Sequence, residues 1–149
     1  MKKIFLIVLL FFSSCGYNSI YVNKNLKNLE FYEIALEGDA RINKIIISSL
    51  SLKKDVLNDN LNKLFLRTNY RIDETSKNSK GKVKTYRSVI IVEVDISKNN
   101  KILNSKKIEK NFSYNNVSNK YELVEYQNKI KTDLIDGILE EIILFLNLG

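Results

Sequence analysis

From residue 64 onward, hydrophobic and polar residues alternate along long stretches of the chain. A period of two places every second side chain on the same face, as in a β-strand with one buried face. This pattern predicts strands over residues 64–72, 83–96 and 102–114. The last two are joined by residues 97–101, whose asparagines tolerate the positive φ angles of a tight turn, so we expect a hairpin there. Residues 75–81 are polar and should form a flexible connection.

The region before these strands changes period. Residues 29–36 predict a first strand, and Gly38 and Asp39 then interrupt the pattern. Aspartate is a favoured N-cap residue, so Asp39 should begin a helix. The hydrophobic residues that follow recur at helical spacing, at Ile42, Ile45, Ile46 and Leu50. We expect a short helix here, followed by a polar loop over residues 53–60.

A longer amphipathic stretch closes the chain. From about residue 121 to 147, hydrophobic residues recur three or four positions apart and predict a helix with one apolar face. Asn119 and Glu122 resemble a capping box at its start. The order β-α-β-β-β-α predicts an α+β fold, in which two helices pack on one face of a four-stranded, mostly antiparallel sheet. Residues 29–149 should form this single domain.

The first residues have the pattern of an export signal. Two lysines precede residues 4–12, which are all hydrophobic but too few to cross about 30 Å of hydrocarbon as a helix. Residues 13–16, Ser-Ser-Cys-Gly, follow directly. They resemble the bacterial lipobox, the motif in which a cysteine is acylated and becomes the first residue of the mature protein.

We therefore predict that residues 1–14 are a lipoprotein signal peptide and that Cys15 is lipidated. Residues 15–28 would be the lipidated N-terminus and a polar tether. More than one acyl chain on Cys15 would anchor the protein stably. Gly16 stands where an aspartate would favour the inner membrane, so we expect the periplasmic face of the outer membrane. The alternative is an ordinary signal peptide that leaves a free thiol at Cys15.

Composition narrows the function classes. The chain has no histidine and one cysteine, so it lacks the usual general base, a common metal ligand and any internal disulfide. We expect no enzyme, no metal site and no cofactor. The net charge is +7, but a secreted chain does not meet cytoplasmic nucleic acid, so we expect no nucleic-acid partner. Residues 77–110 contain ten Lys and Arg against three Asp and Glu, whereas residues 111–149 contain three against six.

Several motifs occur in a characteristic order along the mature chain. Cys-Gly-Tyr at residues 15–17, with Tyr21 nearby, opens it, and Gly-Asp-Ala-Arg at residues 38–41 begins the first helix. The strand over residues 83–96 is followed by a short hairpin, and residues 112–121 link into the closing amphipathic helix. Together these motifs resemble the LPS-assembly lipoprotein family, LptE, in its alphaproteobacterial form, over the whole mature chain.

The resemblance implies a structural role instead of a reaction. Members of the family sit at the inner face of the outer membrane and plug the lumen of the large β-barrel LptD. They also assist assembly of that barrel and help lipopolysaccharide reach the cell surface. For this chain, the resemblance implies an LptD-like outer-membrane β-barrel and lipopolysaccharide as partners. The alternative is a periplasmic lipoprotein that serves as an auxiliary component of an ABC-type lipid transporter.

Basic residues are the sharpest functional candidates. Lipopolysaccharide carries phosphates, which Lys and Arg bind well. The candidate lipopolysaccharide-binding residues are Lys80, Lys82, Lys84, Arg87 and Lys120. The resemblance points first to Lys82, which follows Gly81, and to Lys120, which precedes the last helix. The alternative is a solvated, lysine-rich strand edge that prevents aggregation.

Three further groups have a simpler structural interpretation. Arg67 and Arg71 lie on an exposed strand face and should pair with acidic residues of neighbouring strands, with barrel contact as the alternative. Four aromatic residues should belong to the core, namely Tyr86, Phe112, Tyr114 and Tyr121. Four acidic residues should form the solvated side of the last helix, namely Asp133, Asp136, Glu140 and Glu141.

Overall fold

The computed structural model describes residues 29–148. The predicted signal peptide, Cys15 and the predicted tether over residues 15–28 lie outside the described residues. Four strands form the main sheet, in the order β2-β4-β5-β6. Their bounds are Glu33–Gly38 for β2, Lys63–Lys77 for β4, Val83–Lys98 for β5 and Lys101–Asn115 for β6. β2 and β4 are parallel, whereas β4, β5 and β6 follow one another antiparallel.

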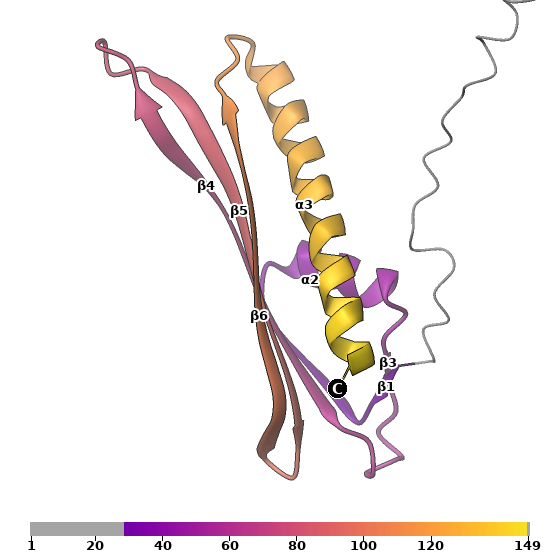
Figure 1. The fold of residues 1–149 in the computed structure, drawn as a ribbon. Helices are drawn as coiled ribbons and strands as arrows, with labels where there is room; N and C mark the ends of the chain where they lie inside the picture. The colour runs from indigo at the N-terminus through magenta and orange to yellow at the C-terminus, as the bar shows by residue number, and fades with distance from the viewer. Residues whose placement is uncertain (1–28, 149) are drawn as a thin grey trace, which may run out of the picture.

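Two helices cover one face of this sheet and leave the other face uncovered (Figure 1). α2 (Ala40–Ser49) packs on β2 and β4, while α3 (Lys120–Leu148) packs on β5 and β6. The predicted α+β fold, with two helices on one face of a four-stranded, mostly antiparallel sheet, is therefore confirmed.

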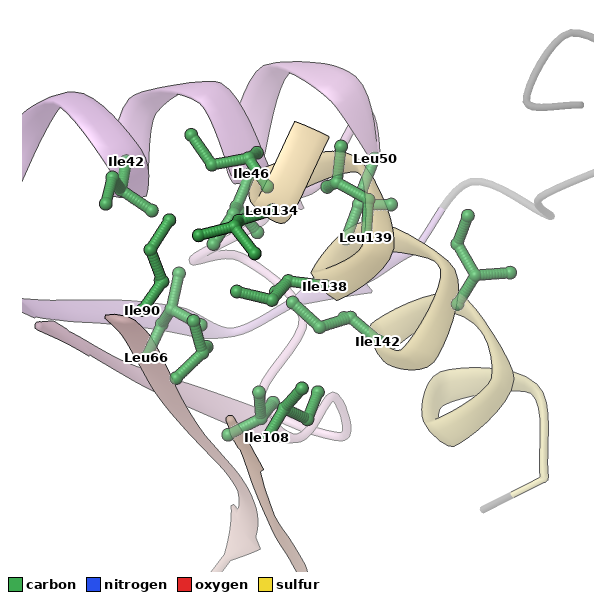
Figure 2. Packing of buried hydrophobic residues seen from close by; sticks show 14 of the residues in the cluster. Ile42, Ile46, Leu50, Leu66, Ile90, Ile108, Leu134, Ile138, Leu139 and Ile142 are labelled. Carbon is green, nitrogen blue, oxygen red and sulfur yellow. The ribbon is translucent and has the colours of Figure 1, made fainter. Parts of the chain in front are cut away.

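The core lies between the helices and the sheet. Figure 2 shows side chains of α2 and α3 meeting those of the strands. The largest fully buried side chains include Ile42, Ile46, Leu50, Leu64, Leu66, Ile90, Ile108, Ile138 and Ile142. On β4 and β5, every second residue points into this layer, as the alternating pattern predicts. Each buried Leu or Ile contributes about 1.5–3 kcal/mol, so this layer is the main favourable term in folding.

The predicted first strand over residues 29–36 and the predicted loop over residues 53–60 differ from the structure. The chain bends at Tyr32, so the strand divides into β1 (Glu30–Phe31) and β2. β1 pairs in parallel with β3 (Lys53–Lys54), which lies in the region predicted as loop. A strand of two residues is too short to show an alternating pattern. Tertiary contacts, not the local sequence, therefore determine where β1 and β3 form.

The connection predicted as flexible over residues 75–81 is mostly strand and tight turn. β4 extends to Lys77, and β5 begins soon after the turn. The side chain of Asn78 accepts hydrogen bonds from the backbone N–H groups of Lys80 and Lys82, each at 3.0 Å. Asparagine often orders turns in this way. The polar composition of the segment therefore reflects an exposed hairpin end.

The predicted hairpin turn over residues 97–101 is confirmed in a tighter form. β5 continues to Lys98 and β6 begins at Lys101, so Asn99 and Asn100 alone make the turn. Their φ angles are 49° and 61°. Both angles lie in the left-handed region that a type I′ turn requires, and asparagine enters this region more readily than most residues.

Two adjacent residues shape the junction of β2 and α2. Gly38 has a φ of 89°, and a Cβ atom there would overlap the carbonyl oxygen of Thr68. The same carbonyl accepts a hydrogen bond from the N–H of Asp39 at 3.1 Å. The Asp39 side chain accepts from the N–H of Ile42 at 2.9 Å, which confirms the predicted N-cap. Burial alone would raise the pKa of Asp39, but this hydrogen bond and the charge of Lys131 bring it below its ordinary value.

Replacing Gly38 with alanine should destabilise the fold strongly, because the added Cβ meets the backbone of β4 at a positive φ angle. We expect Gly38→Ala to lower the free energy of unfolding by about 3 kcal/mol. Gly81→Ala is the matched control, since Gly81 has a φ of 75° but nothing within 4 Å of an added Cβ. Its loss should be about 1 kcal/mol. Urea denaturation measures the free energy of unfolding of both variants. Equal losses would contradict the close approach of Gly38 to the backbone of Thr68.

Candidate functional site

One end of the molecule brings two distant chain segments together. The turn between β4 and β5 and the connection from β6 to α3 both lie at the upper end of the molecule in Figure 1. Between them is a cleft of about 540 Å³. Residues between 78 and 86 line one side of it, and residues between 116 and 123 line the other.

Three of the five candidate basic residues line this cleft, namely Lys82, Lys84 and Lys120. Lys82 lies in the turn just before β5, and Lys84 lies two positions further along. Lys84 shares the strand face that carries Tyr86, because side chains alternate along a strand. Lys120 is the first residue of α3. We call this site the lysine cleft.

Two asparagines hold the second side of the lysine cleft. The backbone N–H of Asn116 donates to the carbonyl of Lys84, and its side-chain Nδ2 donates to the carbonyl of Val83, each at 2.8 Å. Asn119 caps α3 by accepting from a backbone N–H of its first turn, and its amide donates to Glu122 at 3.0 Å. The Asn119–Glu122 bond joins two side chains, so it is not the reciprocal capping box. Asn116 was not among the predicted site residues, and only its place in the link to the last helix marked it.

The other two candidates do not line the cleft. Lys80 is exposed in the β4–β5 turn, where its backbone N–H donates to Asn78. Arg87 follows Tyr86 on β5 and therefore points to the opposite face of the sheet. There its Nε donates to the hydroxyl of Ser113 at 3.1 Å. The structure thus brings Lys82, Lys84 and Lys120 together and separates Arg87 from them.

A row of tyrosines lies beneath the cleft and continues along α3. The rings of Tyr86 and Tyr114 are stacked with centroids 5.8 Å apart. Tyr126 meets Tyr114 edge to face, with centroids 5.6 Å apart. Tyr114 is buried and Tyr86 is partly buried, which agrees with the core placement predicted for these two residues.

Phe112 and Tyr121, also predicted in the core, are instead 48% and 71% exposed. Phe112 lies on β6, the edge strand of the sheet, and Tyr121 lies in the first turn of α3, so neither side chain is enclosed between helix and sheet. Val124 on α3 is exposed as well. A hollow of about 420 Å³ lies between Phe112 and Tyr126. The lysine cleft therefore adjoins exposed hydrophobic surface.

The cleft lysines differ from the lysines of β6 in their pairing. Lys82, Lys84 and Lys120 form no ion pair within the described part of the chain. By contrast, Lys106 and Lys110 of β6 contact Glu141 of α3 at 3.5 and 2.5 Å. The hydrogen bond from Lys110 lowers the pKa of Glu141. Glu141, whose side chain remains 33% exposed, therefore also takes part in the contact between helix and sheet, which the prediction of a solvated position did not include.

Ion pairs cross the uncovered face of the sheet. Arg67 of β4 contacts Glu37 of β2 at 3.0 Å and Glu93 of β5 at 3.1 Å. Lys107 of β6 contacts Glu93 at 3.3 Å, so the network reaches all four strands. The pairing predicted for Arg67 is present, whereas Arg71 pairs within its own strand.

Among residues 29–148, no three His, Cys, Asp or Glu side chains lie close enough to hold a metal ion. No helix in this range is both long and apolar enough to cross a bilayer. The residues that line the lysine cleft are lysine, asparagine, serine, tyrosine and aliphatic residues. This set binds through charge, hydrogen bonds and apolar contact.

No protein-family model matches the chain, and no curated protein matches it in sequence. Several solved structures share its fold. Rare lipoprotein B from Shewanella oneidensis has a TM-score of 0.60 at 13% identity, over 77% of this chain and 93% of that one. Lipoprotein B from Nitrosomonas europaea has a TM-score of 0.53 at 14% identity, over 81% of this chain and 85% of that one. A minor lipoprotein from Acinetobacter baumannii has a TM-score of 0.50 at 19% identity, over 76% of this chain and 89% of that one. At these identities, the likeness establishes that the chain has a fold found in bacterial lipoproteins.

The cleft lysines should be dispensable for folding, because no ion pair within residues 29–148 depends on them. We expect Lys82→Gln, Lys84→Gln and Lys120→Gln each to change the free energy of unfolding by less than about 0.5 kcal/mol. Lys110→Gln is the control, since it removes the nearer partner of Glu141. It should cost more than any cleft variant, up to about 1 kcal/mol. Urea denaturation compares them, and a cleft variant as costly as Lys110→Gln would indicate a structural role.

Proposed function

We propose that the protein is an LptE-like lipoprotein, anchored through Cys15 at the periplasmic face of the outer membrane. In this role it plugs an LptD-like β-barrel, helps to assemble it and contacts lipopolysaccharide during transport to the cell surface. The observation that carries the proposal is the lysine cleft beside exposed hydrophobic surface. The lipobox-like start of the chain and the fold that it has in common with bacterial lipoproteins support it.

The chemistry of the cleft suits a ligand with two contrasting parts. Lipopolysaccharide combines phosphate groups and acyl chains in one molecule. The ammonium groups of Lys82, Lys84 and Lys120 are donors for phosphate oxygens. Tyr121 directly follows Lys120, and Phe112 lines the neighbouring hollow, so apolar surface for an acyl chain lies alongside. Phosphate binding would not need to break an ion pair of the three lysines.

The uncovered face of the sheet suits contact with the interior of a barrel. The interior of an outer-membrane barrel is polar. On the uncovered face, Arg67, Glu93 and Lys107 present charged groups that are already paired with one another or with Glu37. A paired network offers hydrogen-bond donors and acceptors without a large excess of one charge. Such a face can contact a polar lumen at low desolvation cost.

We propose a binding role without catalysis. The residues that line the lysine cleft include no carboxylate. The chain as a whole contains no histidine, so the most common general base is missing. A lysine can act as a base when burial lowers its pKa, but the three cleft lysines are exposed.

Removing the charge of two cleft lysines should weaken lipopolysaccharide binding, because charge-assisted hydrogen bonds to phosphate are lost. We expect Lys82→Gln with Lys120→Gln to raise the dissociation constant about tenfold or more. The control is Lys44→Gln with Lys53→Gln, which removes the same charge at exposed sites outside the cleft. Binding of purified lipopolysaccharide by isothermal titration separates the two. If both double variants weaken lipopolysaccharide binding equally, the loss reflects the net charge of the protein and not a site in the lysine cleft.

Co-purification tests the proposed partner directly. After crosslinking of intact cells, affinity capture of the tagged protein followed by mass spectrometry should recover an outer-membrane β-barrel as the main partner. Recovery of an inner-membrane permease would favour the ABC-transporter alternative, as would normal surface lipopolysaccharide after depletion of the protein. Capture without any barrel would end the proposal.

A Cys15→Ala variant, exported through a cleavable signal, shows what the anchor contributes. If a barrel encloses the domain, the variant should still co-purify with it, because the interface then lies in residues 29–148. Loss of all co-purification, at unchanged periplasmic amounts of the variant, would show that the anchor is part of the interface.

A further inference from the structure

The end of the molecule opposite the lysine cleft exposes a group of aliphatic side chains. In the segment between β3 and β4, Leu57 is 94% exposed and Val56 is 57% exposed. At the start of β6, Ile102 is 60% exposed and Leu103 is 50% exposed. Figure 1 shows both segments at the lower end of the molecule. We call these four residues the apolar end.

The two segments of the apolar end are braced against each other. The Nζ of Lys98, next to the β5–β6 turn, donates to the carbonyl of Asn60 at 2.8 Å. The Asp55 side chain accepts from the N–H of Leu57 at 3.0 Å, and the N–H of Asp55 donates to the carbonyl of Phe31 at 2.9 Å. These bonds order the backbone around the apolar end, and at least half of each of the four aliphatic side chains stays exposed.

The described chain also begins at this end. The N–H of Lys53 donates to the carbonyl of Leu29 at 3.0 Å, so the first described residue lies beside β3, just before Val56 and Leu57. The 14 residue-to-residue steps from Cys15 to Leu29 span at most about 48 Å when fully extended. β5 runs from one end of the sheet to the other, and its 16 residues measure about 50 Å. An acylated Cys15 therefore lies within easy reach of the apolar end, but reaches the lysine cleft only on a nearly stretched chain.

The charges around the apolar end suit a phospholipid surface. Residues 53–60 and 98–103 contain four lysines and two aspartates. Aliphatic side chains among ammonium groups are typical of proteins that bind at a bilayer interface, where the hydrocarbon enters and the ammonium groups meet phosphate. Val56 and Leu57 stand in a turn, and Ile102 and Leu103 stand in the first residues of β6 beside a second turn, instead of in the middle of a flat face. That shape fits a fluid bilayer better than a rigid protein partner.

We propose that the apolar end rests in the interface of the phospholipid bilayer that holds the lipid anchor. This rests on the anchoring through Cys15 that is part of the proposed function. The tether makes the contact intramolecular, so four side chains with little affinity of their own are sufficient.

The chain contains no tryptophan and one cysteine, which gives a clean experiment. The chain that begins at Cys15 is coupled through its only thiol to a maleimide lipid in vesicles of phosphatidylethanolamine and phosphatidylglycerol. Half of the vesicles carry brominated acyl chains, which quench tryptophan on contact. Leu57→Trp and Leu103→Trp report on the apolar end. Ser79→Trp, at an exposed residue of the β4–β5 turn at the opposite end, is the matched control.

We expect brominated lipid to lower the emission of Leu57→Trp and Leu103→Trp about twofold, with a shift to the blue, and to leave Ser79→Trp unchanged. If Leu57→Trp is quenched no more than Ser79→Trp, the inference is overturned and the apolar end is left for a protein partner. Because the coupling is chemical, the result does not depend on whether cells acylate Cys15. Failure here is therefore distinct from failure of the lipoprotein proposal.

Discussion

The packing of α3 on the sheet is the contact on which the other features depend. Ile138 and Ile142 of the helix are fully buried against the layer that contains Ile90 and Ile108 of β5 and β6. β5 and β6 are much longer than α2, and α3 runs along them. The sheet therefore continues beyond α2 in both directions and ends in a hairpin at each end (Figure 1). The lysine cleft forms where α3 begins, and the apolar end lies toward the end where α3 stops. The two ends of the molecule therefore present different side chains, lysines near the first turn of α3 and aliphatic residues toward its last turn.

Most of the fold follows from local pattern, and the exceptions have a physical reason. The period of two in β4, β5 and β6 and the stripe of α3 are long enough to identify these elements and their buried faces. β1 and β3 have two residues each, so they carry no period. Their pairing depends on α2, because this helix brings the residues of β3 back beside β1. Lys77 continues β4 despite its polar neighbours, because an exposed hairpin needs no hydrophobic residues.

The site was less predictable than the fold. The sequence marks Lys82 and Lys120 as basic, but the chain is rich in lysine and composition does not separate free lysines from paired ones. The pairing of Lys110 with Glu141 depends on how α3 lies across β6, which no local pattern contains. Phe112 has the spacing of a core residue, yet it is exposed because it lies on the edge strand β6, which α3 covers only in part at this position. Burial is a property of the second layer as much as of the residue itself.

The parallel pairing of β2 with β4 has a consequence for the order of folding. β4, β5 and β6 are joined by tight turns and can pair as soon as they are synthesised. β2, by contrast, must wait for β4 across the whole of α2. α3, which supplies much of the core, is the last element of all. Since non-local contacts form slowly, the chain exposes the hydrophobic face of its sheet until the final helix has been synthesised and has packed on it. The newly made protein is therefore most prone to aggregation just before the 29 residues of α3 are complete.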